Sequence, residues 1–415
     1  MDITPSYPIR LTGYAVRKTE SEGVAQHIYA KALALGSDDK NVAVLITVDN
    51  CGVPASVRDE VAMRLHKSKR LDPDHLAICS THTHCAPWLE GFAPNIFGAP
   101  ISEEEQARVR RYTGELTQAL VHVAEQALEG RKPSRLSRGL ASAGFAANRR
   151  TKGGPVDHDL PVMFVTAPDG ALRAVFASYA CHCTTLGGDF NQVCGDWAGY
   201  AQESIEREHP GTIALMALGC GGDANPDPRS KIELAQKYGQ GIATAVDSLW
   251  AGKLMAINGP LVCRAKKIEL FFDELPTKAD WETLAKQTNF VGGHARLNLA
   301  RLNRGEYLPT KLPYLVQTWT FGNSLGMVFL AGEVVVDYSL RLKRELDASR
   351  LWINAYANDV PCYIPSERIL QEGGYEGGGA MIYYDKPTRL APGVENLIVG
   401  TVHDLLPPEF LVKRP

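Results

Sequence analysis

The sequence predicts an α/β protein in which mixed β-sheets are flanked by α-helices and candidate metal ligands lie at strand ends. Residues 41–48 form a nearly continuous apolar run of the kind that is buried on both faces of a sheet. Residues 53–65 have helical spacing, and residues 75–79 form a second apolar run. This strand, helix, strand order favours helices packed on a sheet, with binding groups collected at strand ends.

The elements that surround this unit are expected in the following order. Residues 26–35 have helical spacing, and residues 102–128 predict a long helix that Ser102 caps. Residues 161–166 and 171–180 flank the turn sequence Pro-Asp-Gly and therefore predict a hairpin.

The second half of the chain continues the alternation of strands and helices. We expect strands over 212–218, 261–272 and 352–357, helices over 231–250 and 334–344, and a hairpin that joins 314–321 to 325–330. Residues 273–313 are polar enough to form an excursion or lid. No internal repeat, low-complexity segment or linker interrupts the chain, so we expect a single domain over residues 1–415.

Composition excludes several classes of function. The net charge of -3 provides no basic stripe for nucleic acid, and no run of about 18 apolar residues could span a membrane. The chain opens without a charged-then-apolar leader, so as it stands we expect a cytoplasmic protein, or a secreted or periplasmic one if a leader was removed. The nine cysteines lack the spacing of a disulfide framework, and we expect free thiols.

Histidines follow two of the predicted strands. His82 and His84 lie two residues apart after the strand over 75–79, so both can face one cleft if the segment is extended. His182 follows the second strand of the hairpin. Neutral imidazole is a common zinc ligand and titrates near neutral pH, so one histidine could hold a metal while another moves protons. The alternative is that these are hydrogen-bonded structural histidines.

A series of short motifs, each weak alone, occurs in a fixed order along most of the chain. They are Asp2-Ile3-Thr4-Pro5, Gly13-Tyr14-Ala15, His82-Thr83-His84-Cys85-Ala86-Pro87, Asn148-Arg149, Val156-Asp157, Ala180-Cys181-His182, Gly195-Asp196-Trp197-Ala198-Gly199-Tyr200-Ala201, Gly222-Asp223-Ala224-Asn225-Pro226, Gly332-Glu333, and Tyr363 with Tyr375. Together they resemble the catalytic domain of the neutral, non-lysosomal ceramidases, which are zinc-dependent amidases.

The resemblance implies a zinc ion, Zn2+, held by two histidines, a glutamate and a tyrosine. These ligands fall on His82, His182, Glu333 and Tyr363. The set is chemically sensible, because nitrogen and oxygen donors with one carboxylate suit a zinc that keeps a position for water. By the same resemblance, His84, Arg149 and Tyr375 would handle protons and the oxyanion. Asp196 and Asp223 could orient the histidines, or serve as a cap and a turn residue.

Two departures from the family separate this chain from its relatives. Asn225 stands where the family has a serine implicated in catalysis, which rules out a hydroxyl nucleophile there, although the amide could hydrogen-bond substrate. We also expect no counterpart of the family's carboxy-terminal immunoglobulin-like domain, which flanks the lipid pocket. We therefore expect long-chain ceramide to be a poor substrate.

The expected function is a zinc-dependent hydrolase that cleaves the amide bond of a small molecule with metal-activated water. An ester or lactone on the same site, and a homologue that binds a ligand without turnover, are the alternatives. A further one is a cysteine nucleophile at Cys85 or Cys220 paired with His84. The expected partner is a small amide or ester, and the resemblance leaves a lipid-like one open.

Overall fold

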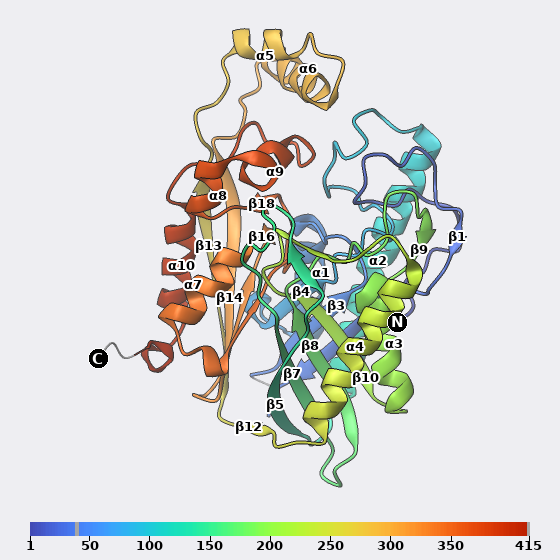
Figure 1. Cartoon of the computed structure of the whole chain (residues 1–415), viewed down its shortest axis with the longest axis vertical. Helices are drawn as coiled ribbons and strands as arrows, with labels where there is room; N and C mark the ends of the chain where they lie inside the picture. The colour runs from blue at the N-terminus through green and yellow to red at the C-terminus, as the bar shows by residue number, and fades with distance from the viewer. Residues whose placement is uncertain (38–40, 413–415) are drawn as a thin grey trace.

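Three β-sheets occupy the centre of the molecule, and helices cover their outer faces (Figure 1). The computed structural model describes residues 1–37 and 41–412. The three-stranded sheet holds β2 (Ala30–Leu35), β3 (Ala43–Val48) and β4 (Leu76–Ser80). The five-stranded sheet has the order β10 (Ile213–Leu218), β8 (Leu172–Tyr179), β7 (Asp159–Thr166), β5 (Arg135–Ser142) and β12 (Met255–Ile257). The four-stranded sheet has the order β13 (Leu261–Phe271), β14 (Lys311–Phe321), β15 (Leu325–Leu330) and β17 (Leu351–Asn354).

Three further pairings are only two or three residues long. They join β1 (Gly23–Val24) to β9 (Gln192–Val193), β6 (Ala146–Asn148) to β11 (Ala224–Pro226), and β16 (Glu333–Val334) to β18 (Tyr363–Ile364). The last two pairings contain residues that the sequence singled out, so short strands rather than the large sheets carry much of the site.

The helices pack on the sheets through their apolar faces. The helices are α1 (Ala55–Lys69), α2 (Glu103–Glu129), α3 (Asp196–Glu208), α4 (Ile232–Trp250), α5 (Lys278–Leu284), α6 (Phe290–Asn303), α7 (Val336–Glu345), α8 (Glu367–Glu372), α9 (Gly374–Gly377) and α10 (Val394–Leu405). Helix α2 packs on β2 and β3, α3 on β10, and α10 on β13 and β14. No described helix is long and apolar enough to cross a membrane.

The three sheets share one interior. An apolar cluster includes Leu45, Met163, Phe176, Trp319 and Phe329, which come from β3, β7, β8, β14 and β15. All five side chains are fully buried. Burial of such large apolar side chains is worth roughly 1.5–3 kcal/mol each, so this interior fixes the sheets against one another.

The predicted class of mixed sheets flanked by helices is confirmed, and most predicted elements lie within a few residues of their expected bounds. The parallel pairing of β3 with β4 confirms the strand, helix, strand unit, and β7 with β8 forms the expected antiparallel hairpin. The helix expected over 26–35 is wrong. Residues 30–35 form β2, because pairing along the whole of β3 satisfies their backbone groups and overrides a weak helical spacing.

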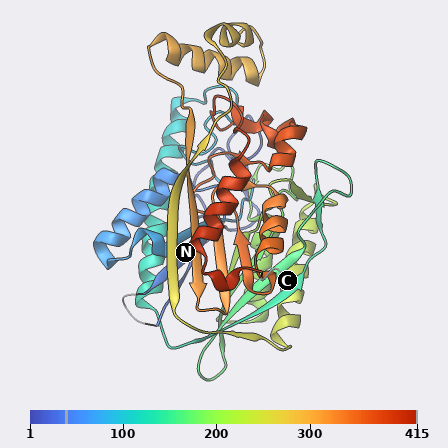
Figure 2. The ribbon, with the colours of Figure 1, turned by 90° about the vertical axis from the view of Figure 1, so that its left-hand side faces the viewer.

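The polar segment 273–313 is an excursion that contains α5 and α6 and projects beyond the body of the molecule (Figure 2). Two side-chain contacts join it to the body of the molecule. The rings of Phe290 and Tyr383 lie 5.3 Å apart, and the Arg301 guanidinium is paired with the Asp385 carboxylate. These contacts tether α6 to the loop that follows α9.

Candidate active site

Short backbone pairings bring the predicted site residues together from distant parts of the chain. Thr83 and Cys183 form an isolated parallel bridge, which aligns the loop after β4 with the loop after β8. The His182 backbone N–H donates to the Ala224 carbonyl over 3.0 Å. Glu333 lies directly opposite Tyr363 in the β16–β18 pair. Two histidines, a glutamate and a tyrosine therefore converge although up to 281 positions separate them in the sequence.

Backbone carbonyls fix the tautomer of both predicted histidine ligands. His82 Nδ1 donates to the carbonyl of Cys51, and His182 Nδ1 donates to the carbonyl of Gly221 over 2.8 Å. A carbonyl can only accept a hydrogen bond, so each Nδ1 carries a proton, and Nε2 is the nitrogen that each ring can offer to a metal. His82 also has a φ of 54°, a backbone conformation that costs energy outside glycine and is typical of functional sites.

The Nε2 atoms of both histidines face the same carboxylate oxygen. Glu333 Oε2 lies 3.2 Å from His82 Nε2 and 3.0 Å from His182 Nε2, and the Tyr363 hydroxyl lies 3.2 Å from His182 Nε2. Ligand atoms about 2.1 Å from a tetrahedral zinc lie roughly 3.4 Å from one another. A proton or a metal ion must lie between these nitrogens and the carboxylate, and the donor types and their spacing fit a zinc ion.

Without a metal, a proton would lie within this cluster. Burial lowers the pKa of His82, but Cys51 and Glu333 outweigh it and raise that pKa to about 10, so His82 would be protonated and paired with Glu333, and zinc would displace that proton. Burial raises the pKa of Glu333, but the neighbouring His82 and His182 outweigh it and hold that pKa well below its usual range. Burial and the nearby Arg149 lower the pKa of His182 to about 4. Burial raises the pKa of the Tyr363 phenol, so that phenol would keep its proton without a cation nearby. An ionised carboxylate and a neutral imidazole are the forms that bind zinc.

His84 faces the same cluster from the cleft side. Its Nε2 lies 3.1 Å from His82 Nε2, and burial together with His82 and His182 lowers its pKa well below the usual value, so the ring is neutral. The ring packs against Gly13, where a Cβ would lie 2.3 Å from the imidazole. Its buried Nδ1 has no partner among the described residues. Glycine at position 13, with a φ of 87°, thus makes room for His84.

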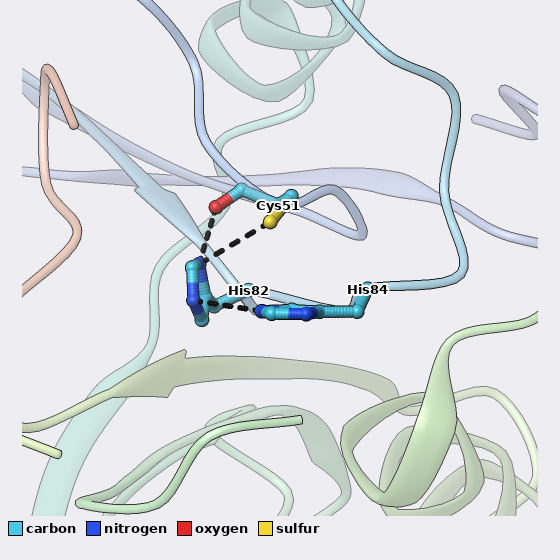
Figure 3. Close-up of side chains that lie close together, drawn as sticks. All are labelled: Cys51, His82 and His84. Carbon is cyan, nitrogen blue, oxygen red and sulfur yellow. Dashed lines mark hydrogen bonds between the residues drawn. The ribbon is translucent and has the colours of Figure 1, made fainter. Parts of the chain in front are cut away.

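Cys51 offers a second grouping with His82 and His84, shown in Figure 3. In this view dashed lines join His82 both to Cys51 and to His84. The Cys51 sulfur lies 3.7 Å from His82 Nδ1, whereas His84 lies at the opposite nitrogen, Nε2. Burial raises the pKa of the Cys51 thiol, so it is protonated and lacks the charge that Glu333 supplies. The cluster of His82, His182 and Glu333 is therefore the better metal site.

Arg149 lies beside the cluster and is fixed by hydrogen bonds. Its Nε donates to Glu376 over 2.8 Å, and its Nη2 donates to the Tyr363 hydroxyl over 2.9 Å. The predicted Tyr375 lies next to both, with its ring 5.3 Å from the Tyr363 ring and 5.6 Å from the Arg149 guanidinium. Arg149 is thus a fixed positive charge next to the predicted metal ligands.

Asn225 occupies the wall of the same space. Its Oδ1 accepts hydrogen bonds from Thr184 Oγ1 over 3.2 Å and from Arg149 Nη1 over 3.4 Å. Its Nδ2 donates no hydrogen bond within the described part of the chain. This leaves one amide donor available to a bound molecule.

Asp196 and Asp223 do not contact the histidine rings, so the structure favours the second of the two alternatives, a cap and a turn residue. Asp223 accepts from the backbone N–H of Val336 at the start of α7 and from Asn148. Asp196 accepts from the backbone N–H groups of Leu186 and Trp197. Both are cap or turn residues, because backbone carbonyls already hold the ring nitrogens.

Two buried tyrosines that the sequence did not single out complete the site. The Tyr384 hydroxyl donates to Glu333 Oε1, which leaves Oε2 for the histidines. The Tyr356 ring packs 4.4 Å from the His82 ring, and its hydroxyl has no partner among the described residues. Tyr384 lies nine residues after Tyr375, at no spacing that periodicity could reveal.

The cysteine alternatives lie away from any open surface. Cys85 and Cys220 are buried, and burial raises the pKa of the Cys85 thiol to about 12 and also raises that of Cys220. The thiolate is the nucleophilic form, and neither residue forms it near neutral pH. Neither cysteine lines the cleft that opens beside the histidine cluster.

A cleft of about 660 Å³ opens above the cluster. Its walls are polar and aromatic, and no aliphatic side chain of the described chain contributes to them. They are formed by Gly13, Tyr14, His84, Arg149, Arg150, Thr151, Thr184, Asn225, Arg229, Tyr363, Gly374, Tyr375 and Glu376. The predicted site residues that are not metal ligands all line this cleft, namely His84, Arg149, Tyr375 and Asn225. The excursion over 273–313 contributes no residue to these walls.

Comparison with known proteins agrees with this arrangement. Residues 1–299 match the family model of the neutral/alkaline non-lysosomal ceramidase, N-terminal. Among curated proteins, no sequence matches this chain. The crystal structure of neutral ceramidase from Pseudomonas aeruginosa shares the fold, with 18% identity, a TM-score of 0.74, and coverage of 100% of this chain and 75% of that one. A ceramidase solved in complex with C2 gives 16% identity, a TM-score of 0.75, and coverage of 100% and 76%.

The family model spans most of the chain and includes His82, His84, Arg149, His182 and Asn225. The solved structures, at these identities, support the fold. The chain therefore belongs to the neutral/alkaline non-lysosomal ceramidase family, whose members are hydrolases that act on amide bonds.

Proposed function

We propose that this protein is a zinc-dependent amidase that hydrolyses small polar amides in the cleft above His82, His182 and Glu333. One observation carries the proposal. Two imidazole Nε2 atoms and an ionised carboxylate, all buried, converge at the spacing of zinc ligands beside a cleft large enough for a small molecule. Tyr363 is the proposed fourth ligand, because its hydroxyl joins the same cluster.

A bound zinc ion would supply Lewis acidity to the amide carbonyl and lower the pKa of a water molecule. The remaining steps belong to side chains of the cleft. His84 Nε2 faces the cluster and is neutral, so it can accept a proton from the attacking water and return it to the amine that leaves. Arg149 and Tyr375 would stabilise the negative oxygen that develops on the carbonyl.

Asn225 would bind the substrate rather than attack it. An amide side chain is not a nucleophile, and its Nδ2 is the donor left free by the contacts of Oδ1 with Thr184 and Arg149. Attack by water needs no hydroxyl nucleophile, so the loss of the family's serine is compatible with turnover.

Long-chain ceramide is not the proposed substrate. Burial of a lipid tail is worth about 0.8 kcal/mol for each CH2 group, but only against an apolar wall. The walls of this cleft hold arginines, threonines and an asparagine, and among the described residues that line it only the tyrosine rings offer a large apolar surface. A small amide with polar groups fits these walls better.

Zinc content and amide hydrolysis, measured on the same samples, test the proposal. The wild-type protein should hold about one zinc per chain and release amine from a short-chain amide. His182→Ala should lose most of the metal and the activity. His122→Ala, which changes an exposed histidine of α2, is the matched control and should lose neither. A metal-free wild-type protein that remains fully active would refute the proposal, as would long-chain ceramide cleaved faster than short polar amides.

A further inference from the structure

The cleft carries more positive than negative charge. Three of its lining residues are arginines, Arg149, Arg150 and Arg229, and one is a carboxylate, Glu376. The arginines and the carboxylate therefore sum to a net charge of +2, from three positive charges and one negative.

The single carboxylate is already engaged. Glu376 Oε1 accepts from Arg149 Nε over 2.8 Å, and Glu376 Oε2 accepts from Arg150 Nη1 over 2.6 Å. Arg150 also pairs with Glu372 over 3.1 Å, on the side of α8. Glu376 thus fixes two guanidinium groups, and it has no oxygen to spare for a third.

Arg229 is the charge that remains without a partner. It forms no ion pair or hydrogen bond with any described residue, and its side chain is exposed at the wall of the cleft. It lies near Tyr14, where its charge opposes the rise that burial causes in the pKa of that phenol. The Tyr14 ring packs 4.8 Å from the His84 ring, so Arg229 lies on the His84 side of the cleft.

The backbone around Arg229 is held in place from both sides. The Ser230 N–H donates to the Thr185 carbonyl over 2.6 Å, and the Tyr238 hydroxyl donates to the Pro228 carbonyl. The Asp227 N–H donates to the carbonyl of Phe145 over 2.9 Å. The segment is thus built into the structure, which places the backbone of Arg229 at the wall of the cleft.

We propose that the amide substrate carries an anionic group, a carboxylate or a phosphate, which Arg229 binds while the amide lies over the buried cluster. This inference rests on the proposed amidase function and names the substrate class. Guanidinium presents paired donors that match either anion. Because Arg229 has no partner among the described residues, an anion can bind to it without breaking an existing ion pair. The net charge of the cleft would also draw an anion in from solution.

Four short amides that differ in one group provide the test. N-butanoylethanolamine is neutral, N-butanoylglycine and N-butanoylphosphoethanolamine carry an anion on the amine side, and the ethanolamide of butanedioic acid carries one on the acyl side. We expect kcat/KM for at least one anionic amide to exceed that of the neutral amide by about tenfold or more. The preferred compound distinguishes carboxylate from phosphate and one side from the other. The preference should shrink as ionic strength rises, because Arg229 is exposed.

Variants assign the preference to Arg229. Arg229→Gln should lower kcat/KM for the preferred anionic amide about tenfold more than for the neutral amide, and Arg229→Glu should reverse the preference. Arg344→Gln removes an equally exposed arginine that has no ion pair among the described residues and does not line the cleft, so it should keep the preference. Equal rates for all four amides, or a preference that survives Arg229→Glu, would overturn the inference while leaving the amidase proposal intact.

If none of the four amides is hydrolysed, that result counts against the proposed amidase. Binding measurements then test the role of Arg229. Isothermal titration calorimetry of the zinc-loaded protein should then show an anionic compound bound about tenfold more tightly than N-butanoylethanolamine. That difference should disappear in Arg229→Gln. Equal affinities, or a difference unchanged in Arg229→Gln, would refute the role of Arg229.

Discussion

Tyr384→Phe tests how the proposed zinc site is held together. The Tyr384 hydroxyl donates to Glu333 Oε1, and within residues 1–37 and 41–412 it is the one hydrogen-bond partner of that oxygen. Both side chains are buried, and burial raises the pKa of Tyr384 well above its usual value, so the hydroxyl stays a donor at any ordinary pH. Removing the hydroxyl frees Glu333 to rotate away from His82 and His182.

The size of the effect follows from the kind of contact that is lost. Partners that orient metal ligands typically contribute 10–100-fold in metal affinity, which corresponds to roughly 1.4–2.7 kcal/mol. We therefore expect Tyr384→Phe to weaken zinc binding by about 10–100-fold, as measured by competition with a chelator of known affinity. Metal-free Tyr384→Phe should also unfold more easily, because a buried carboxylate oxygen without a partner costs about 1–3 kcal/mol.

Tyr356→Phe is the matched control. Tyr356 is equally buried and packs on His82, but its hydroxyl has no hydrogen-bond partner among the described residues. Phenylalanine keeps the ring, so zinc affinity should stay within about twofold of wild type. Wild-type affinity in Tyr384→Phe, or an equal loss in both variants, would show that the contact with Glu333 does not hold the metal site.

Three further outcomes are expected. His84→Ala should lower kcat/KM by about a hundredfold or more while zinc content is unchanged, and retained activity would remove His84 from proton transfer. Cys85→Ser and Cys220→Ser should each keep activity within about tenfold, whereas loss of activity with zinc retained would indicate a cysteine nucleophile. Asp385→Asn should lower the free energy of unfolding in urea at pH 7 by about 2 kcal/mol, because two side chains of α6 outweigh burial and lower the Asp385 pKa to about 2. A depressed pKa stabilises the fold above about pH 4, so wild type and variant should converge as pH falls from about 4 to about 2, and a constant difference would contradict this.

Elements with a strong local signal could be predicted from the sequence. The strand β3 is a run of six buried apolar residues, and α2 begins at a capping box in which Ser102 and Glu105 bond to each other's backbone. The strand β2 could not be predicted, because its alanines and leucines suit a helix as well as a strand. Only its antiparallel partner β3 decides between them.

The candidate site has almost no local signal. Glu333 and Tyr363 meet in a strand pair only two residues long, which is too short for any periodicity. The four proposed ligands could therefore be named only through the order of family motifs, whereas their convergence is a property of the fold. Tyr384 acts through a single hydrogen bond to a ligand, and no spacing in a sequence predicts such a contact.

The partners of the two histidines connect the proposed metal site to the proposed substrate class. His82 and His182 both donate Nδ1–H to backbone carbonyls, which carry no net charge, so among the described residues Glu333 is the one carboxylate of their cluster. A dication held by these three side chains would keep a net charge of about +1 while Tyr363 stays protonated, and Arg149 adds another positive charge beside it. With zinc bound, the cleft would therefore be cationic both at its wall and beside the metal. Such a field would stabilise the oxyanion of amide hydrolysis, and it would repel substrates whose free end is an amine while favouring those whose free end is an acid.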